Sequence, residues 1–272
     1  MREPAKDATA ESSLDFRDLL KVALEAAREA LVVAGRYADD LDSLEFEEKH
    51  TGKSAGADVV SVADREVETS IRAVISRHRP QDAILGEEGG LTEGGRCVWT
   101  IDPIDGTLNY SYGRNEWAVS IAVSVDGETV AGVVATRKPE RYFTAVLGGG
   151  SFLNGKLIRP RQTRNLSDSI IDLGRGRGAT RDIFTDVVSE LDKTCRDVRR
   201  GGCAALAACQ VACGELDAMY GPGLEEWDIA AGALIALESG ASVRERKDDI
   251  TLIAAIDVMA ELERVIDRVT KK

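Results

Sequence analysis

Histidine is nearly absent from this chain of 272 residues, which contains only His50 and His78. A Ser-His-Asp hydrolase needs a histidine as its general base, and zinc sites draw on histidine and cysteine ligands. The five cysteines are an odd number and lack the spacing of a disulfide framework or a zinc motif. The sequence therefore disfavours both kinds of site, and hydrolytic chemistry in this chain would have to use carboxylates and metal ions.

Long apolar runs and an excess of positive charge are also missing. No stretch approaches the roughly 18 apolar residues of a membrane-spanning helix. Residues 1–13 are polar and lack the apolar core of a signal peptide, so we expect a disordered tail on a cytoplasmic protein. With 47 acidic and 35 basic residues, the formal net charge of −12 would repel a nucleic-acid backbone. We therefore expect neither a membrane nor a nucleic acid as partner.

The remaining sequence alternates between helical and extended patterns. Apolar residues at helical spacing predict helices over residues 14–37 and 64–79, separated by a polar loop or hairpin. β-Branched and aromatic residues predict strands over residues 83–85, 98–101, 117–125, 130–136 and 142–147. Further signals predict strands over residues 169–173, 216–220 and 250–255, and helices over 182–193, 204–213, 227–239 and 257–270. The sequence thus predicts an α/β fold in one domain over residues 14–272, with closely packed halves at 14–155 and 156–272.

The segment Asp-Pro-Ile-Asp-Gly-Thr, from Asp102 to Thr107, is the most informative part of the chain. It follows a predicted strand and carries two carboxylates three residues apart, Asp102 and Asp105. Mg²⁺ prefers oxygen ligands and often binds carboxylates together with phosphate oxygens. Gly106 lets backbone N–H groups approach an anion closely, and Thr107 adds a hydroxyl. The segment therefore indicates a metal-and-phosphate site, with an ordinary Pro/Gly surface turn as the alternative.

Further acidic residues lie where predicted turns meet regular elements. Glu87 follows the strand over residues 83–85, Asp228 opens the helix over 227–239, and Asp64 opens the second helix. Each also has an ordinary explanation: Asp228 as a first-turn acid favoured by the helix dipole, Asp64 as a capping partner, and Glu87 as a solvated loop charge. If these carboxylates converge with Asp102 and Asp105, their mutual repulsion predicts bound cations.

Three motifs occur in order: Gly-Glu-Glu over residues 86–88, Trp-x-x-Asp-Pro-x-Asp-Gly-Thr-x-Asn over 99–109, and Trp-Asp-x-Ala-Ala-Gly over 227–232. Together they resemble the inositol monophosphatase family of lithium-sensitive, magnesium-dependent phosphatases, and the resemblance extends over nearly the whole chain. It implies a layered α-β-α-β-α sandwich of the inositol monophosphatase and fructose bisphosphatase type. It also implies a homodimer that hydrolyses a small phosphorylated substrate.

The resemblance implies a metal-binding role for each matching residue. Glu87, Asp102 and the carbonyl of Ile104 would hold a first Mg²⁺ ion. Asp102, Asp105 and Asp228 would hold a second ion, and a third, weaker ion would lie near Glu87. Two to three Mg²⁺ ions in each active site are therefore expected.

Catalytic and substrate-binding roles follow from the same resemblance. Thr107, oriented by Asp64, would help to deprotonate the attacking water, and Glu87 would act with them. Lys53 matches a lysine on the family's mobile metal-binding loop, or is an ordinary exposed lysine. The implied phosphate and substrate contacts are Asp105, Gly106, Thr107, Gly202, Cys203, Ala204 and Asp228.

Two departures from the family leave the substrate open. Cys203 replaces the usual hydroxyl of a Gly-Ser/Thr-Ala segment, which removes a good hydrogen-bond partner. Gly221 stands where an acidic residue of the inositol monophosphatases contacts the sugar alcohol, and Glu225 or Glu226 would have to replace it. Inositol 1-phosphate is the predicted substrate, with fructose 1,6-bisphosphate, another bisphosphate or histidinol phosphate as alternatives. A non-catalytic descendant that binds metal or anions is a remote alternative.

Arginines in a glycine-rich loop, Arg175 and Arg177, form an unusual basic cluster in this acidic protein. Arg199 and Arg200 follow later, just before the Gly202 segment. Guanidinium groups bind phosphate oxygens in pairs, so the loop is suited to a second phosphate of the substrate. A solvated surface loop is the alternative.

Overall fold

The computed structural model describes residues 14–41, 46–49, 58–176, 179 and 181–271. The predicted tail over residues 1–13, together with Lys53 and Arg177, lies outside these residues. Within them every predicted helix and strand is present, with ends that shift by at most four residues. The prediction of one domain in two halves stays a prediction.

The larger sheet has eight strands in the order β10-β9-β8-β7-β6-β5-β3-β4. Its strands are β3 (Ala83–Gly86), β4 (Gly90–Leu91), β5 (Cys97–Asp105), β6 (Ala118–Val125), β7 (Glu128–Thr136), β8 (Arg141–Val146), β9 (Gly150–Leu153) and β10 (Lys156–Leu157). Only β3 and β5 pair in parallel among these described strands. The carboxyl end of β3 therefore lies beside the middle of β5.

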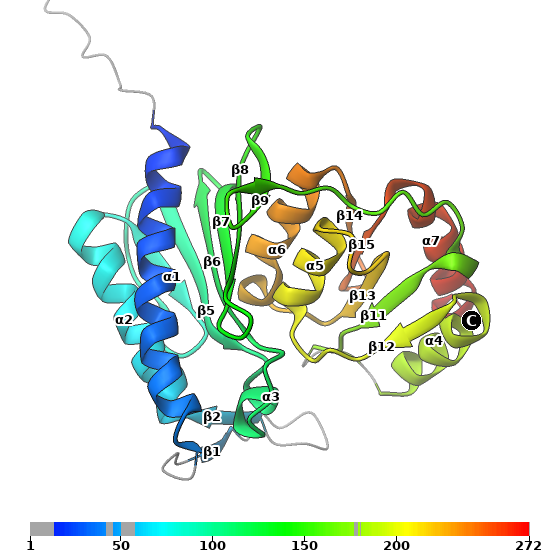
Figure 1. Ribbon diagram of the computed structural model, residues 1–272, viewed down its shortest axis with the longest axis horizontal. Coiled ribbons are helices and arrows are strands. Elements are labelled where there is room, and N and C mark those ends of the chain that lie inside the picture. Colours follow the sequence, from blue (N-terminus) through cyan, green and yellow to red (C-terminus); the bar gives the residue numbers. More distant parts are fainter. Residues whose placement is uncertain (1–13, 42–45, 50–57, 177–178, 180, 272) are drawn as a thin grey trace, which may run out of the picture.

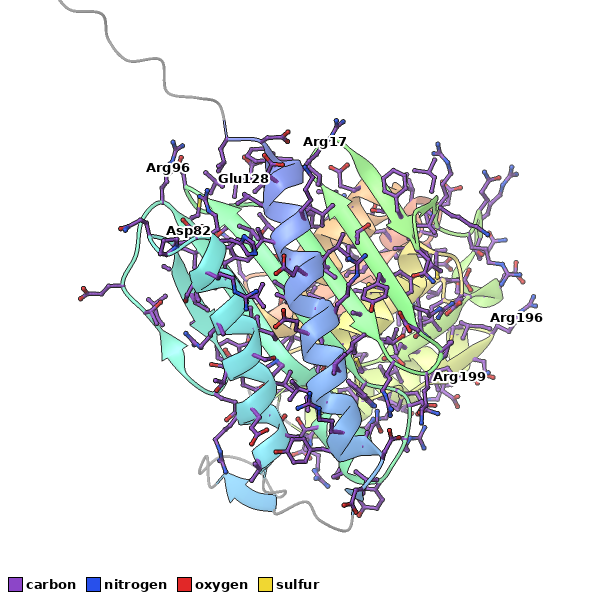
Figure 2. All side chains as sticks on the ribbon, turned by 60° about the vertical axis from the view of Figure 1, so that its left-hand side comes forward. Arg17, Asp82, Arg96, Glu128, Arg196 and Arg199 are labelled. Carbon is purple, nitrogen blue, oxygen red and sulfur yellow. The ribbon has the colours of Figure 1, made fainter. Side chains whose placement is uncertain are left out.

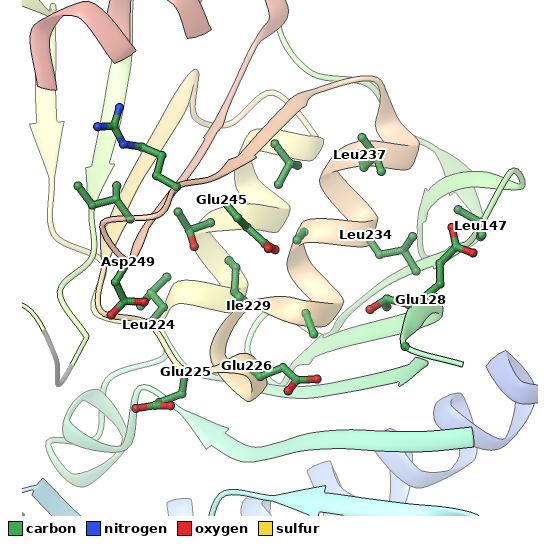
Figure 3. A pocket seen from close by; sticks show the side chains of 18 residues that line it. Glu128, Leu147, Leu224, Glu225, Glu226, Ile229, Leu234, Leu237, Glu245 and Asp249 are labelled. Atoms are coloured by element: carbon green, nitrogen blue, oxygen red, sulfur yellow. The ribbon is translucent and has the colours of Figure 1, made fainter. Parts of the chain in front are cut away.

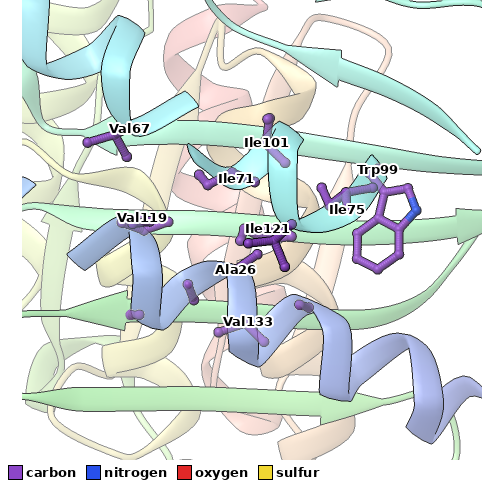
Figure 4. Packing of buried hydrophobic residues seen from close by; sticks show 14 of the residues in the cluster. Ala26, Val67, Ile71, Ile75, Trp99, Ile101, Val119, Ile121 and Val133 are labelled. Atoms are coloured by element: carbon purple, nitrogen blue, oxygen red, sulfur yellow. The ribbon is translucent and has the colours of Figure 1, made fainter. Parts of the chain in front are cut away.

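Helices α1 (Phe16–Ala38) and α2 (Val62–His78) cover one face of this sheet (Figure 1). Helix α1 turns a row of buried alanines and leucines toward the strands, which lets its backbone lie close to them. Figure 4 shows Ala26 of α1 and Ile71 of α2 beside Ile121 of the sheet. This apolar cluster fixes the strands that carry the acidic motif.

Helices α5 (Ala204–Ala212) and α6 (Glu226–Ser239) form the middle layer and cover the other face of the large sheet (Figure 1). They pack closely because their contact residues are small. A Cβ atom on Gly232 of α6 would lie 2.7 Å from the Cβ of Ala208 of α5. The first residues of both helices reach the edge of the sheet where β5 ends.

The second sheet has the order β12-β11-β13-β15-β14 and completes the layers. Its strands are β11 (Ile170–Leu173), β12 (Asp197–Arg199), β13 (Ala218–Pro222), β14 (Ser242–Glu245) and β15 (Ile250–Ala254). Strand β11 pairs in parallel with both β12 and β13. Helices α4 (Arg181–Thr194) and α7 (Ile256–Thr270) pack on its outer face (Figure 1). The predicted α-β-α-β-α sandwich is confirmed.

Several short elements carry too weak a pattern for the sequence to reveal them. They are β4, β10, β12, β14, the helix α3 (Thr107–Ser111) and a 3-10 turn at Leu166–Asp168. The stretch expected as a loop or hairpin contains the antiparallel strands β1 (Phe46–Lys49) and β2 (Asp58–Ser61). Charged side chains such as Arg17 and Arg196 project from the outer surface (Figure 2). Among the described helices, none combines the length and the apolar character needed to cross a membrane.

Candidate active site

The two carboxylates of the Asp102–Thr107 segment leave the sheet where β5 is irregular. The pairing of β5 with β6 shifts between Asp102 and Asp105, and the carboxylate of Asp102 accepts the backbone N–H of Ile104 at 3.0 Å. Both aspartates are buried, with 1% of Asp102 and 8% of Asp105 exposed. Burial of both side chains excludes the reading of this segment as a solvated surface turn.

Parallel pairing brings Glu87 to the same place. Gly86 is paired with Ile101, and the backbone N–H of Glu87 donates to the carbonyl of Ile101 at 3.2 Å. Glu87 therefore follows β3 beside Asp102, and the two residues line one cavity of 210 Å³. The sequence alone suggested a solvated loop charge as the alternative for Glu87, but the sheet directs the residue into the acidic site.

Asp228 joins the cluster from the first turn of α6. Oxygen atoms of Asp102, Asp105 and Asp228 all lie within 4.8 Å of one another. Asp228 also accepts the backbone N–H of Glu225 at 2.8 Å and so caps the helix. The capping role and the convergence with the other carboxylates are therefore both present, and the cap fixes the side chain in its position.

Electrostatic repulsion within the cluster is strong. Burial, followed by the negative charges of Glu87 and Asp105, raises the pKa of Asp102 well above its usual range. Burial and the charge of Asp228 raise the pKa of Asp105 to about 8. Carboxylates that are buried together and repel one another are stabilised by a divalent cation, and an all-carboxylate set of donors suits Mg²⁺. The described residues therefore form a cluster that fits a metal ion.

Asp105 is held by the start of α5. Its carboxylate accepts the backbone N–H of Ala205 at 2.7 Å and the thiol of Cys203 at 3.0 Å. Burial and the nearby charge of Asp105 raise the pKa of Cys203 well above its usual value, so the thiol keeps its proton and donates. The thiol therefore keeps a hydrogen bond to Asp105, although sulfur is a weaker partner than the usual hydroxyl.

Thr107 contacts the acid that the sequence paired with it. Its hydroxyl lies 3.4 Å from a carboxylate oxygen of Asp64 and 3.1 Å from the carbonyl of Ile104. Asp64 is 1% exposed, and the preceding Gly106 has the left-handed backbone angle φ of 91°. A side chain on Gly106 would also press against the carbonyl of Glu116 at 3.0 Å, so this turn requires glycine.

Two polar residues that sequence reasoning missed hold the loops of the site. Glu68 is 2% exposed and accepts the backbone N–H groups of Glu88 and Gly89, each at 2.8 Å. Asn109 donates to the carbonyls of Glu116 at 2.6 Å and Gly201 at 2.7 Å. Asn109 is the last residue of the second motif, so the motif carried the signal although it gave no role.

Arg175 of the arginine loop belongs to the described lining of the acidic cavity, whereas Glu225 and Glu226 do not. Arg175 lines the acidic cavity together with Arg200, as do Gly202, Cys203 and Ala204. Gly221 lies buried in β13. Glu226 instead accepts the hydroxyl of Thr100 at 3.2 Å.

A larger cavity of 590 Å³ lies beside α6 (Figure 3) and shares only Leu224 with the described lining of the acidic cavity. Its lining includes Glu225, Glu226, Ile229 and Leu234. The neighbouring turn between β14 and β15 spans only residues 246–249. Because its lining contains neither Asp102 nor Asp105, we place the chemistry in the smaller cavity.

Comparisons of the sequence and of the structure with known proteins point to one family. The family profile named inositol monophosphatase family matches residues 15–271. The chain is 41% identical over 202 residues to an inositol-1-monophosphatase of Mycobacterium bovis, covering 70% of each. It is 33% identical over 258 residues to the Nus factor SuhB of Pasteurella multocida, covering 93% of this chain and 95% of that protein. The crystal structure of extragenic suppressor protein suhB from Bartonella henselae matches with a TM-score of 0.86 and 30% identity, over 92% of this chain and 99% of that one. The resemblance seen in the motifs is therefore confirmed, and the chain belongs to the inositol monophosphatase family.

Proposed function

We propose that this protein is a Mg²⁺-dependent phosphatase that hydrolyses a small phosphate monoester. The observation that carries the proposal is the convergence of Asp102, Asp105 and Asp228 with oxygen atoms within 4.8 Å of one another. The family profile over residues 15–271 supports the same reaction class. The name inositol-1-monophosphatase, carried by the Mycobacterium bovis relative, makes inositol 1-phosphate the first substrate to test.

The residues would form two sets of metal ligands that share Asp102. Glu87, Asp102 and the carbonyl of Ile104 would hold one ion, and Asp102, Asp105 and Asp228 would hold another. When bound, the ions would neutralise the phosphate dianion, polarise the attacking water and stabilise the leaving alkoxide. The first N–H groups of a helix have no partner within it, so the backbone at the start of α3 would bind phosphate oxygens.

Thr107 and Asp64 would remove the proton of the attacking water. When the Thr107 hydroxyl donates to Asp64, its oxygen is left as an acceptor for a hydrogen of water. As the water oxygen attacks phosphorus, the water proton would pass to Thr107 and the threonine proton to Asp64. Burial of Asp64 keeps bulk water from competing for this route.

Phosphate release tests the proposed reaction directly. The purified chain should release phosphate from inositol 1-phosphate with millimolar Mg²⁺ and lose this activity in excess EDTA, with recovery when Mg²⁺ is restored. As the family resemblance implies, we also propose a homodimer and inhibition by Li⁺. Activity that persists in EDTA would contradict the metal mechanism, and absence of turnover of every phosphomonoester tried would favour a non-catalytic descendant.

Replacing Thr107 by valine should lower kcat by about a hundredfold or more, because the side chain keeps its shape and loses the hydroxyl that relays the proton. Thr107→Ser restores the hydroxyl and is the matched control, for which we expect at least about a tenth of the original kcat. Steady-state phosphate release with saturating Mg²⁺ measures both variants. Equal kcat values for Thr107→Val and the original protein would remove Thr107 from the proton route.

A further inference from the structure

Two arginines connect the acidic cavity to a second cavity on its flank. Arg175 follows β11 and Arg200 follows β12, and these strands are parallel neighbours in the smaller sheet. Both arginines line the 210 Å³ cavity that contains Asp102 and Asp105. Both also line an adjoining cavity of 370 Å³, whose other described lining residues are Arg181, Phe184, Thr185 and Val188.

Phe184 of α4 holds the two guanidinium groups in place. The Cζ atoms of Arg175 and Arg200 lie 6.0 and 5.4 Å from the centre of its ring. The ring is 6% exposed and stacks on Tyr220 of β13, with ring centres 6.2 Å apart. An aromatic face attracts cations, so the ring orders both guanidinium groups without neutralising them. Because the ring is buried, it leaves no face on which a nucleobase could stack.

The guanidinium groups of these two arginines lack a direct acidic partner among the described residues. Within the described residues, neither Arg175 nor Arg200 forms an ion pair, whereas Arg199 pairs with Asp197 at 2.6 Å. No carboxylate belongs to the described lining of the 370 Å³ cavity, which holds three arginines. Asp172, a buried residue that accepts the N–H of Gly201 at 2.7 Å, interacts electrostatically with Arg200 but forms no ion pair with it. A concentration of guanidinium groups without partners favours a bound anion.

We propose that Arg175 and Arg200 bind a second anionic group of the substrate, so that this enzyme prefers a small sugar or polyol bisphosphate to the corresponding monophosphate. The proposal rests on the proposed phosphatase function of the acidic cavity. One phosphate would lie at the carboxylates and their ions, and the other would lie in the 370 Å³ cavity. The sequence suggested Arg175 and Arg177 as the site of a second phosphate. In the described structure, Arg175 instead lines the same two cavities as Arg200.

The chemistry of guanidinium explains this preference. Each guanidinium can donate two parallel hydrogen bonds to one phosphate, and such charge-assisted bonds are stronger than those to a neutral hydroxyl. Losing one of these contacts typically weakens binding by about tenfold or more. A monophosphate would leave both guanidinium groups to water and would gain nothing from them.

Fructose 1,6-bisphosphate and fructose 1-phosphate are matched probes, because they differ only in the second phosphate. With saturating Mg²⁺, we expect kcat/KM for release of the 1-phosphate to be at least about tenfold higher for the bisphosphate. Arg200→Gln and Arg175→Gln should each lower this ratio by about tenfold, mainly through KM of the bisphosphate. Arg199→Gln is the control, because it removes the same charge from a neighbouring side chain that already has a partner and projects from the surface (Figure 2).

The outcomes separate this inference from the function on which it rests. A ratio near one in the original protein, or a ratio that Arg200→Gln and Arg175→Gln leave unchanged, would overturn the second-anion site while Mg²⁺-dependent hydrolysis stands. An equal fall in Arg199→Gln would also overturn it, because the effect would then come from net charge alone. Absence of Mg²⁺-dependent release from both probes and from inositol 1-phosphate would instead overturn the proposed function.

Discussion

Asp102→Asn is expected to abolish Mg²⁺-dependent phosphate release while making the metal-free protein more stable. Asp102 is 1% exposed, and its closest electrostatic partners include the carboxylates of Glu87 and Asp105. Asparagine keeps an oxygen that can accept the N–H of Ile104, but it would not supply the negative charge that both proposed sets of metal ligands need. We expect kcat to fall by about a thousandfold, the upper range for loss of one group that stabilises transition-state charge.

The stability effect of Asp102→Asn has the opposite sign. In EDTA at pH 8, removing one charge from the buried cluster should raise the Tm by about 2–4 °C, which corresponds to about 1 kcal/mol in a chain of this size. Calorimetry in EDTA and in Mg²⁺ measures the change, and Mg²⁺ should stabilise the variant much less than the original protein. A lower Tm in EDTA, or an unchanged gain from Mg²⁺, would contradict a metal site at Asp102.

Asp217→Asn is the matched control, because Asp217 is another buried aspartate but lies outside the cluster. It is 2% exposed and accepts the backbone N–H of Ile170 at 2.8 Å and the hydroxyl of Thr163. An amide in its place can leave a donor facing a donor, so this variant should lower the Tm. The gain in Tm from Mg²⁺ should equal that of the original protein. The comparison therefore distinguishes the loss of any buried carboxylate from the loss of a metal-binding carboxylate.

The stability of the metal-free protein should fall as the pH rises from about 5 to about 8. The pKa of Asp105 is raised to about 8 in the fold, whereas an unfolded aspartate has a pKa near 4. In this window the folded state holds a proton that the unfolded state has released, so raising the pH favours unfolding. Asp102 acts in the same direction, because its pKa is also raised.

Bound Mg²⁺ should remove this pH dependence, because a cation stabilises the ionised carboxylates. The gain in Tm from Mg²⁺ should therefore be larger at pH 8 than at pH 6, as calorimetry at both pH values can measure. Asp39, whose pKa Arg137 lowers to about 2, contributes stability that is lost only as the pH falls below about 4, outside this window. A metal-free Tm that rises between pH 5 and pH 8 would count against the uncompensated cluster.

Local sequence was sufficient to single out the acidic residues that the fold brings into the candidate site. Asp102 and Asp105 share one short turn, and Glu87 and Asp228 each lie directly beside an element with a clear apolar pattern. The residues that position them were harder to find. Glu68 and Asn109 are ordinary polar residues within helices, and their function appears only because the fold brings distant backbone groups to them.

The sequence by itself determined the type of each long element, through the spacing of its apolar residues, and the oxygen-rich chemistry of the site, through its acidic motifs. The tertiary structure alone decided which charges meet. Glu87 lies beside Asp102 because β3 and β5 are parallel, and Arg200 joins Arg175 because β11 and β12 are parallel. The physical reason is that apolar spacing is a local property of the chain, whereas strand order depends on how all the buried faces pack together. Repulsion among the carboxylates and among the guanidinium groups therefore arises only in the folded protein. The first favours bound cations at one end of the substrate, and the second favours an anionic group at the other end.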